Sequence, residues 1–292
     1  MAFQWADHLS KRHEVTVLTY RKRGAPEVGP QLPHARVIEW VEPALFRRWE
    51  RFNSLLKPGY FAFARKARRW MRRELARGGR YDLAHQVAPV AMRYPTPLSG
   101  APIPYVIGPV GGSLDSPPGF RDQDTGPWYQ RLRRLDAWRM RHDPWLRATY
   151  ERAACVIGIA DYVAERLSGL HVKRLEILSE TALPEAPAVP QREQVEVSEA
   201  RPLRVLFVGR VVRTKGARDL VAALEFLRDV PVVVDIVGDG FDLTTCKELA
   251  DARGLSASVR FHGRRTRAEV EQFYEQSDVF AFPRFREPGG NV

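Results

Sequence analysis

The chain is best understood from residues 204–216, which read Arg-Val-Leu-Phe-Val-Gly-Arg-Val-Val-Arg-Thr-Lys-Gly. Val205–Val208 is a short apolar run, typical of a strand that is buried on both faces of a parallel sheet. Gly209 follows at the point where the backbone must turn. The residues after Gly216 recur with helical spacing: Asp219, Leu220, Ala223, Leu224 and Leu227. The stretch therefore predicts a strand, a tight turn and a helix, the repeating unit of an open α/β sheet.

Two cations, Arg210 and Lys215, lie in the loop that follows the predicted strand. Open α/β sheets bind ligands at the carboxyl ends of their strands, and a helix that starts there favours an anion. The pattern fits a diphosphate. It fits equally well a plain strand-loop-helix unit with two solvated cations, so this stretch alone leaves both interpretations open.

The length of 292 residues predicts about two domains, and the net charge of +11 is unevenly placed. Residues 1–182 hold 30 Lys and Arg against 18 Asp and Glu, whereas residues 183–200 come to −3 and residues 201–292 to +2. A basic first half favours a phosphorylated ligand, an anionic lipid or a nucleic acid. Two cysteines, no secretory signal after Met1 and no apolar run of membrane-spanning length lead us to expect a cytosolic location.

The first domain is predicted to span residues 1–182. It opens with a helix at 2–11 rather than with a strand and a glycine loop, so we expect an N-terminally truncated fragment. Helices are also predicted within 44–77, 128–151 and 161–167, with breaks at Pro58 and Pro144. The predicted strands are residues 14–20, 36–41, 81–86, 103–107, 154–159 and 175–178.

An acidic, proline-bearing stretch, residues 183–200, is the predicted linker. The alternation restarts after it, with strands at 232–237, 259–262 and 279–282 and helices at 243–253 and 267–276. The chain stops at Val292, where the next helix should begin, so the second domain (201–292) is expected to be incomplete too. The predicted architecture is two doubly wound, Rossmann-like domains that face a cleft.

The basic stretch within 58–77 has two interpretations. One helical face carries apolar residues, and most arginines lie outside it: Arg65, Arg68, Arg69, Arg72 and Arg73. The favoured interpretation is a helix docked on the sheet with a solvated arginine face. The alternative is peripheral contact with an anionic membrane, and both hold if only the arginine tips touch lipid.

Several motifs of other enzyme classes are incomplete in this sequence. The 209–216 loop lacks the order of a phosphate loop, and the Gly238-Asp-Gly turn lacks the third glycine of the dinucleotide fingerprint. Asp122-Gln-Asp124 has the Asp-x-Asp form of metal-dependent sugar-nucleotide enzymes but lies in a loop, and we interpret it as solvated surface. No histidine pair has the spacing of metal ligands, so no metal site is predicted.

The second half resembles the C-terminal domain of family 4 of the retaining glycosyltransferases, which has the two-domain GT-B fold. Four signatures occur in that family's order and spacing: Phe-Val-Gly-Arg-Val-Val-Arg-Thr-Lys-Gly (207–216), Ile-Val-Gly-Asp-Gly (236–240), Val-Arg-Phe-His-Gly (259–263) and Phe-Pro-Arg-Phe-Arg-Glu-Pro-Gly-Gly (282–290). The first half is similar more loosely, at residues 5–19, 81–85 and 108–112.

The resemblance implies that Arg210 and Lys215 hold the diphosphate of the donor and that Glu287 touches the donor sugar. These three are the predicted catalytic residues. Glu287 would be the first acid of a Glu-x7-Glu motif whose second acid falls beyond the chain. The donor-binding glycines implied by the same signatures are Gly209, Gly238, Gly263, Gly289 and Gly290.

The acceptor side is predicted on the first domain, at His85, Gly111 and Gly112. Many members of the family carry a His after the strand equivalent to 103–107, and here Gly108-Pro109 stands in its place. His85, at the end of the preceding strand, is a weak substitute.

The resulting prediction is a retaining, metal-independent glycosyltransferase that uses a nucleotide-diphosphate sugar and no cofactor. Its acceptor would be a lipid-linked carrier or a glycan at the cytosolic membrane face, and we expect weak or no turnover from residues 1–292 alone. The first alternative is a non-catalytic module that binds nucleotide-sugars or anions. The second is a nucleic-acid-binding protein, which no recognition motif supports.

Overall fold

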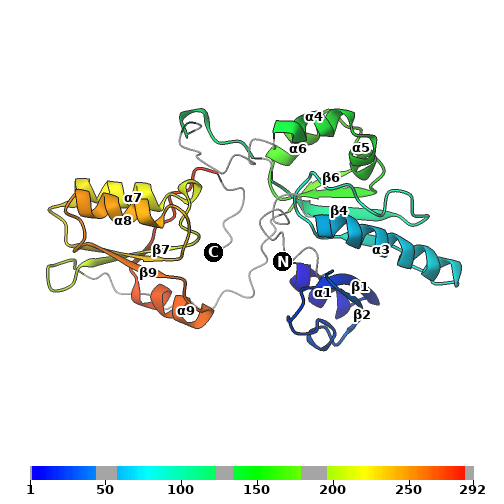
Figure 1. The fold of residues 1–292 in the computed structure, drawn as a ribbon, viewed down its shortest axis with the longest axis horizontal. Coiled ribbons are helices and arrows are strands. Elements are labelled where there is room, and N and C mark those ends of the chain that lie inside the picture. Colours follow the sequence, from blue (N-terminus) through cyan, green and yellow to red (C-terminus); the bar gives the residue numbers. More distant parts are fainter. Residues whose placement is uncertain are drawn as a thin grey trace. The chain divides into compact units, whose positions relative to one another are not determined.

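A computed structural model describes residues 2–43, 58–112, 114–120, 122, 134–178 and 196–286 (Figure 1). The chain divides into two compact units. The first unit consists of Met1–Ser113 and Pro127–Ala182, and the second of Leu114–Gly126 and Leu183–Val292. The second unit thus takes in a short segment that lies, in sequence, between the two parts of the first.

The described residues of the first unit form six strands in two parallel sheets. Strands β1 (Val15–Arg21) and β2 (Ala35–Val41) pair along their whole length, after helix α1 (Ala2–Ser10). The other sheet has the order β3-β4-β5-β6. Its strands are β3 (Ala84–Gln86), β4 (Tyr105–Val110), β5 (Cys155–Gly158) and β6 (Leu175–Ile177). Parallel strands joined through helices confirm the predicted α/β class.

Helices cover both faces of this four-stranded sheet (Figure 1). Helices α4 (Arg134–His142), α5 (Pro144–Glu151) and α6 (Tyr162–Leu167) lie on one side, and α3 (Pro58–Ala76) lies on the other. The core between β4, β5 and the first group contains fully buried apolar side chains, including Ile107, Leu146, Tyr150, Val156 and Val163. Burial of this apolar surface is the main stabilising term for the unit.

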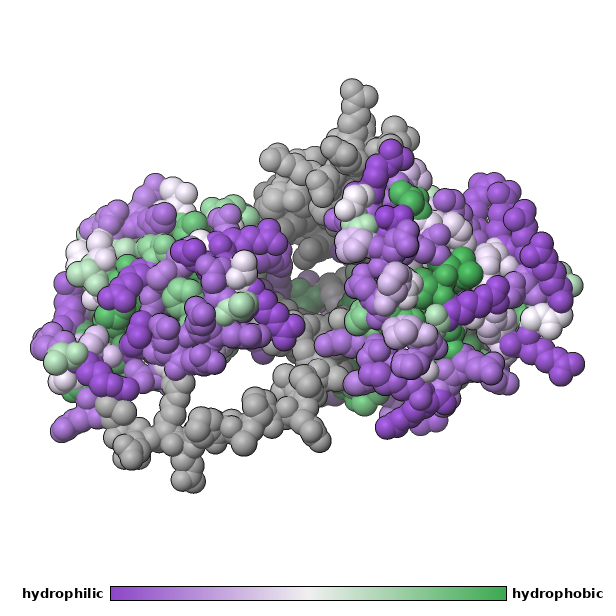
Figure 2. All heavy atoms as spheres, turned by 90° about the horizontal axis from the view of Figure 1, so that it is seen from below, coloured by the Kyte–Doolittle hydropathy of each residue, from purple (hydrophilic) through white to green (hydrophobic). Residues whose placement is uncertain are grey.

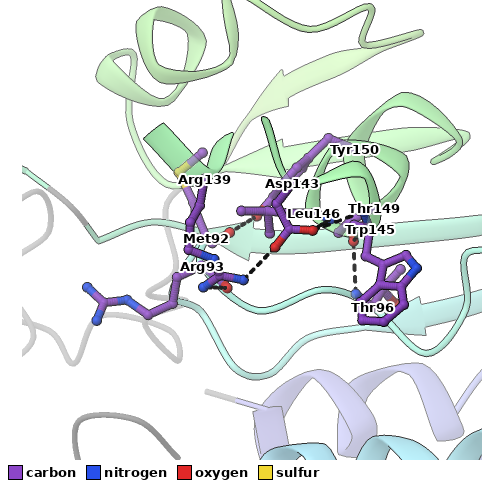
Figure 3. Close-up of polar contacts among 9 residues, drawn as sticks. All are labelled: Met92, Arg93, Thr96, Arg139, Asp143, Trp145, Leu146, Thr149 and Tyr150. Atoms are coloured by element: carbon purple, nitrogen blue, oxygen red, sulfur yellow. Dashed lines mark hydrogen bonds and ion pairs between the residues drawn. The ribbon is translucent and has the colours of Figure 1, made fainter. Parts of the chain in front are cut away.

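The predicted break at Pro144 is confirmed, and Asp143 explains why α5 starts there (Figure 3). One carboxylate oxygen of Asp143 accepts hydrogen bonds from the backbone N–H groups of Trp145 and Leu146, at 3.0 and 3.2 Å. The other accepts a bond from Arg139 at 2.8 Å. Pro144, at the first helical position, has no N–H to satisfy, so the helix end is fully capped.

The same region is tied to the loop after β3 by buried hydrogen bonds (Figure 3). The hydroxyl group of Tyr150 donates to the carbonyl oxygen of Met92 at 2.7 Å, and the N–H of Thr96 donates to the Thr149 hydroxyl at 2.9 Å. Burial raises the pKa of Tyr150 far above its ordinary value. These bonds satisfy polar groups that would otherwise destabilise the core.

Helix α3 buries Tyr60, Ala67 and Met71. The five arginines of the basic stretch are exposed: Arg65, Arg68, Arg69, Arg72 and Arg73. The interpretation of α3 as a docked helix with a solvated arginine face is therefore confirmed.

The second unit has a four-stranded parallel sheet in the order β10-β7-β8-β9. Its strands are β7 (Leu203–Val208), β8 (Val232–Val237), β9 (Val259–Gly263) and β10 (Val279–Phe280). Helices α7 (Ala217–Ala223) and α8 (Leu243–Ala252) cover one face, and α9 (Arg267–Gln276) covers the other (Figure 1). The larger core lies under α7 and α8, around Phe207, Val221, Val234, Ile236 and Cys246. This is the doubly wound arrangement that the sequence predicts.

Several predicted strand boundaries were wrong, including the starts of β4, at 105 rather than 103, and of β7, at 203 rather than 205. Strand β3 begins at residue 84 rather than 81, and β10 ends at 280 rather than 282 because the chain turns there, with Arg284 N–H donating to the Phe282 carbonyl. Strand β4 continues through Gly108-Pro109, beyond the predicted end at residue 107. A register shift after Ile107 lets Val110 pair with Gly158, so the glycine is accommodated inside the strand.

The surface is largely hydrophilic on the face shown in Figure 2, and apolar residues form small separate groups there. Within the described part of the chain, no helix combines the length and the apolar character needed to cross a bilayer.

Candidate functional site

The predicted donor-side turns meet at one edge of the second sheet, where β7, β8 and β9 end. The N–H of Gly209 donates to the carbonyl oxygen of Val237 at 3.0 Å, and the N–H of Gly238 donates to that of Gly263 at 2.8 Å. Gly209, Gly238 and Gly263 therefore lie on adjacent strands. Their turns share the carboxyl edge of a parallel sheet, where open α/β sheets bind ligands.

Two of the glycines in this edge are required by close backbone approach. Gly216 has a φ of +79°, and a Cβ there would collide with the carbonyl oxygen of Pro283. At Gly238, with a φ of +143°, a Cβ would collide with the carbonyl oxygen of Gly209. A larger residue at either position would push neighbouring loops apart.

Lys215 and Arg210 occupy different environments within the first loop. Lys215 ends the 3₁₀ turn η5 (Arg213–Lys215) and is only 8% exposed. Its Nζ atom lies 5.1 Å from the centre of the Phe282 ring. Arg210 is exposed. A cation held against a ring and shielded from water interacts more strongly with an anion than a solvated one does.

The η5 turn lies beside the loop that follows β10. The N–H of Phe285 donates to the carbonyl oxygen of Thr214 at 3.3 Å, and the Arg284 guanidinium lies 5.5 Å from the Phe282 ring centre. Glu287, Gly289 and Gly290 lie outside the described residues, which reach Arg286. The loop that leads to Glu287 is thus attached to the turn that carries Lys215.

Sequence reasoning missed two ion pairs in this region. Arg213 pairs with Asp219, and Arg218 pairs with Asp242, which is 2% exposed. The pairs join η5 to α7 and α7 to the start of α8. Residues 6 or 24 positions apart are not in contact within one regular helix or strand, so spacing carried no signal for them.

His85, the proposed acceptor-side residue of the first unit, is engaged with the backbone. Its Nε2 atom donates to the carbonyl oxygen of Gly108 at 2.8 Å, and its ring meets the Trp5 ring edge-on at 5.2 Å. Burial lowers the pKa of His85, although the bond to Gly108 opposes that shift. The neutral ring therefore has Nε2 occupied and Nδ1 left as its acceptor.

Gly111 and Gly112 come directly after β4, which pairs with β3, the strand that carries His85. Gly111 forms a parallel bridge with Ala91, and the N–H of Gly112 donates to the Tyr162 hydroxyl at 2.9 Å. Tyr162, at the start of α6, was not predicted as a site residue. It holds the glycine turn at the carboxyl edge, where the acceptor side is expected.

The described residues form no metal-binding cluster, and one surface pocket lies away from the donor turns. The described residues contain no group of three or more His, Cys, Asp or Glu side chains that could hold a metal. Of the Asp-x-Asp pair, Asp124 lies outside them and Asp122 is exposed. A pocket of about 390 Å³, lined by Arg201, Arg204 and Arg260 among others, lies where β7 and β9 begin, at the edge opposite the donor turns.

Two family profiles match the chain. Residues 1–179 match the profile described as Glycosyltransferase Family 4, and residues 190–292 match that described as Glycosyl transferases group 1. Among curated proteins, 95 residues are 37% identical to D-inositol 3-phosphate glycosyltransferase from Corynebacterium urealyticum. That match covers 30% of this chain and 22% of the relative, so it spans less than a quarter of the relative's length.

Solved glycosyltransferase structures share the fold. Sucrose-phosphate synthase from Thermosynechococcus elongatus aligns with a TM-score of 0.63 at 20% identity, covering 98% of this chain and 70% of that one. Anabaena Alr3699/HepE in complex with UDP aligns with a TM-score of 0.51 at 14% identity, and the alignment covers 93% of this chain and 74% of that one. At these identities the likeness shows the fold, which is of the GT-B type.

Proposed function

Because the chain belongs to glycosyltransferase family 4, we propose that it transfers a sugar from a nucleotide-diphosphate donor to a lipid-linked or glycan acceptor. The proposal includes retention of configuration at the anomeric carbon and charge stabilisation by protein cations in place of a metal. It assigns the donor to the second unit and the acceptor side to the first.

One observation carries the proposal: a shielded lysine stands at the edge where the donor turns meet. Lys215 is 8% exposed and packs on Phe282, in the turn next to the loop that leads to Glu287. The exposed Arg210 belongs to the same loop. An anion bound at this edge would interact strongly with an ammonium group held in so dry an environment.

The proposed chemistry places these cations on the leaving group. The bond between the anomeric carbon and the diphosphate oxygen breaks, and an oxygen of the acceptor bonds to the same carbon. Negative charge grows on the departing diphosphate as its bond breaks. Arg210 and Lys215 would stabilise this charge, and preorganised cations need no rearrangement at the moment of reaction.

The related structures support the donor class. Anabaena Alr3699/HepE has been solved in complex with UDP, and a second structure of the same protein is a complex with UDP and glucose. We therefore propose that the nucleoside diphosphate part of the donor binds at the carboxyl ends of β7 and β8. Glu287 would contact the donor sugar.

The exposed arginine face of α3 supports a peripheral contact with the cytosolic face of an anionic membrane. A lipid-linked acceptor would be presented at such a surface. Each arginine near an anionic bilayer adds about 1 kcal/mol of attraction, so a face of five is sufficient for reversible binding.

The test of the donor site is nucleoside diphosphate binding by isothermal titration calorimetry. We expect Lys215→Ala to weaken binding by roughly 10- to 150-fold, the loss that corresponds to ~1.5–3 kcal/mol for a charged hydrogen bond. Lys247→Ala is the matched control, because Lys247 also lies over a ring, with its Nζ 5.8 Å from the Phe261 centre, on the same unit. Equal losses in both variants would contradict the assigned site.

Activity is tested by transfer of radiolabelled sugar from nucleotide-sugars to lipid extracts and glycans. Product that forms with wild type and disappears with Lys215→Ala supports the enzyme. Tight nucleoside diphosphate binding by the full-length protein, without transfer to any acceptor, would instead favour the non-catalytic module.

A further inference from the structure

Arg213 lies within the 207–216 signature, in the middle of the predicted donor edge, and neither the sequence analysis nor the proposed chemistry gives its buried guanidinium a role. It starts the η5 turn and is 6% exposed. Its two terminal nitrogens donate to the two carboxylate oxygens of Asp219 in the first turn of α7, one of them at 2.8 Å. This is the two-pronged geometry that only arginine offers a carboxylate, and it fixes the guanidinium plane as well as its position.

The same guanidinium packs against the loop after β10. Its central carbon lies 5.3 Å from the centre of the Phe285 ring. Phe285 is also bound to the η5 turn through its N–H, which donates to the Thr214 carbonyl at 3.3 Å. Arg213 therefore connects three segments: the turn that ends in Lys215, the start of α7, and the loop that reaches Arg286 just before Glu287.

Further aromatic contacts hold Phe285 in the second unit. Its ring stacks on that of Phe120 with centres 4.5 Å apart and an angle of 13° between the planes. The next residue, Arg286, donates to the Ser116 hydroxyl at 3.3 Å. Ser116 and Phe120, which belong to this unit, thus contact the loop that Arg213 contacts.

The core of the unit does not depend on this pair. Helix α7 is anchored by Ala217 and Val221, and Leu224 follows directly after it, all three buried in the core with side chains of β7 and β8. Asp219 is on the outer part of α7, with 39% of its side chain exposed. Arg213 and Asp219 fix the orientation of a turn rather than bury apolar surface.

We propose that Arg213 is a positioning residue for the donor diphosphate. It holds the Lys215 turn and the described part of the loop after β10 in one arrangement before the ligand arrives, so that binding need not order them. The proposal rests on the proposed donor site. It predicts that the paired geometry of Arg213, not its charge alone, sets the affinity.

Arg213→Lys separates geometry from charge, because lysine keeps the charge but cannot make the two parallel bonds. The probe is the diphosphate of uridine, guanosine or adenosine that wild-type residues 1–292 bind most tightly. We expect Arg213→Lys and Asp219→Asn each to weaken its binding by about tenfold, as for the loss of one coupled contact. The double variant Arg213→Lys, Asp219→Asn should bind the nucleoside diphosphate only slightly more weakly than either single variant, since each substitution removes the same interaction.

Arg253→Lys is the control, because Arg253 pairs with Glu225 elsewhere in the second unit. It should bind the probe as wild type does. Thermal unfolding of every variant shows whether it is folded at the titration temperature. If Arg213→Lys is unfolded there, the affinity of Asp219→Asn, a change at a more exposed side chain, tests the proposal instead. Wild-type affinity in Asp219→Asn, or in a folded Arg213→Lys, would overturn the proposal. If the proposed donor site itself is wrong, Lys215→Ala will also bind the nucleoside diphosphate as wild type does. If only the role of Arg213 is wrong, Lys215→Ala will still bind it more weakly.

Discussion

Replacing Gly216 by alanine tests the close packing of the donor edge more directly than any charge change. Gly216 connects η5 to α7 with a φ of +79°, a conformation that costs an L-residue roughly 1–2 kcal/mol. A Cβ there would also meet the Pro283 carbonyl oxygen, which is backbone and cannot rotate away. Accommodating it requires the loop after β10 to shift, at a further cost of about 1–3 kcal/mol, as for overpacked cores. We therefore expect Gly216→Ala to lower the free energy of unfolding by about 2–5 kcal/mol.

Gly254→Ala separates these two contributions. Gly254 lies after α8 in the same unit, also with a positive φ of +65°, but no atom lies within 4 Å of the position its Cβ would take. It should show only the conformational cost, about 1 kcal/mol. Urea denaturation followed by circular dichroism measures both variants.

Nucleoside diphosphate binding then connects the packing to the site. Gly216→Ala moves the turn that carries Lys215, so its affinity should fall, whereas that of Gly254→Ala should not. The reasoning is refuted if the two variants are destabilised equally, because the contact between Gly216 and the Pro283 loop would then be absent in solution.

Two further predictions concern the first unit. Asp143→Ala removes the cap of α5 and should lower the free energy of unfolding by about 1 kcal/mol near neutral pH, measured by thermal denaturation. Burial raises the pKa of Asp143, but hydrogen bonds from an arginine and two backbone amides outweigh it and hold the pKa below its ordinary 3.8. The stabilisation by the Asp143 carboxylate is therefore complete above pH 3.8 and is lost as the pH falls through the lowered pKa. A stability difference between wild type and Asp143→Ala that persists unchanged in strong acid would contradict this assignment. The double variant Arg65→Gln, Arg72→Gln should bind vesicles of phosphatidylcholine and phosphatidylserine roughly 30-fold more weakly, for ~2 kcal/mol lost. Arg260→Gln with Arg264→Gln removes the same charge from the second unit, and an equal loss there, measured by co-sedimentation, would argue against an α3 contact.

The donor side shows how far sequence reasoning reaches in this protein. Gly209 and Gly238 each follow a mostly apolar run, and Gly263 ends the mixed stretch Val-Arg-Phe-His-Gly. Parallel strands bring such ends to one edge whatever the packing details. Their shared location was therefore predictable. Arg210 and Lys215 were assigned together, yet one is exposed and the other buried against Phe282, a ring 67 residues later in the chain.

Local strand limits were less predictable, and β4 is the clearest case. A Gly-Pro pair normally ends a strand, because proline lacks an N–H and glycine disfavours extended backbone. In β4 the pairing resumes beyond it at Val110 and Gly158. That depends on the neighbouring strand, which the sequence of 103–113 does not contain.

Short-range chemistry in the sequence was enough to determine the α/β class, the order of strands and helices, the capped break at Pro144 and the apolar face of α3. These follow from periodicity and from turn and cap residues, whose effects extend over a few positions. Only the tertiary structure decided which side chains surround the donor edge. The packing of the chain creates three sets of contacts: Arg213 with Asp219 and Phe285, His85 with Gly108, and Gly112 with Tyr162. A local sequence pattern does not indicate which distant residues will lie close together in the fold.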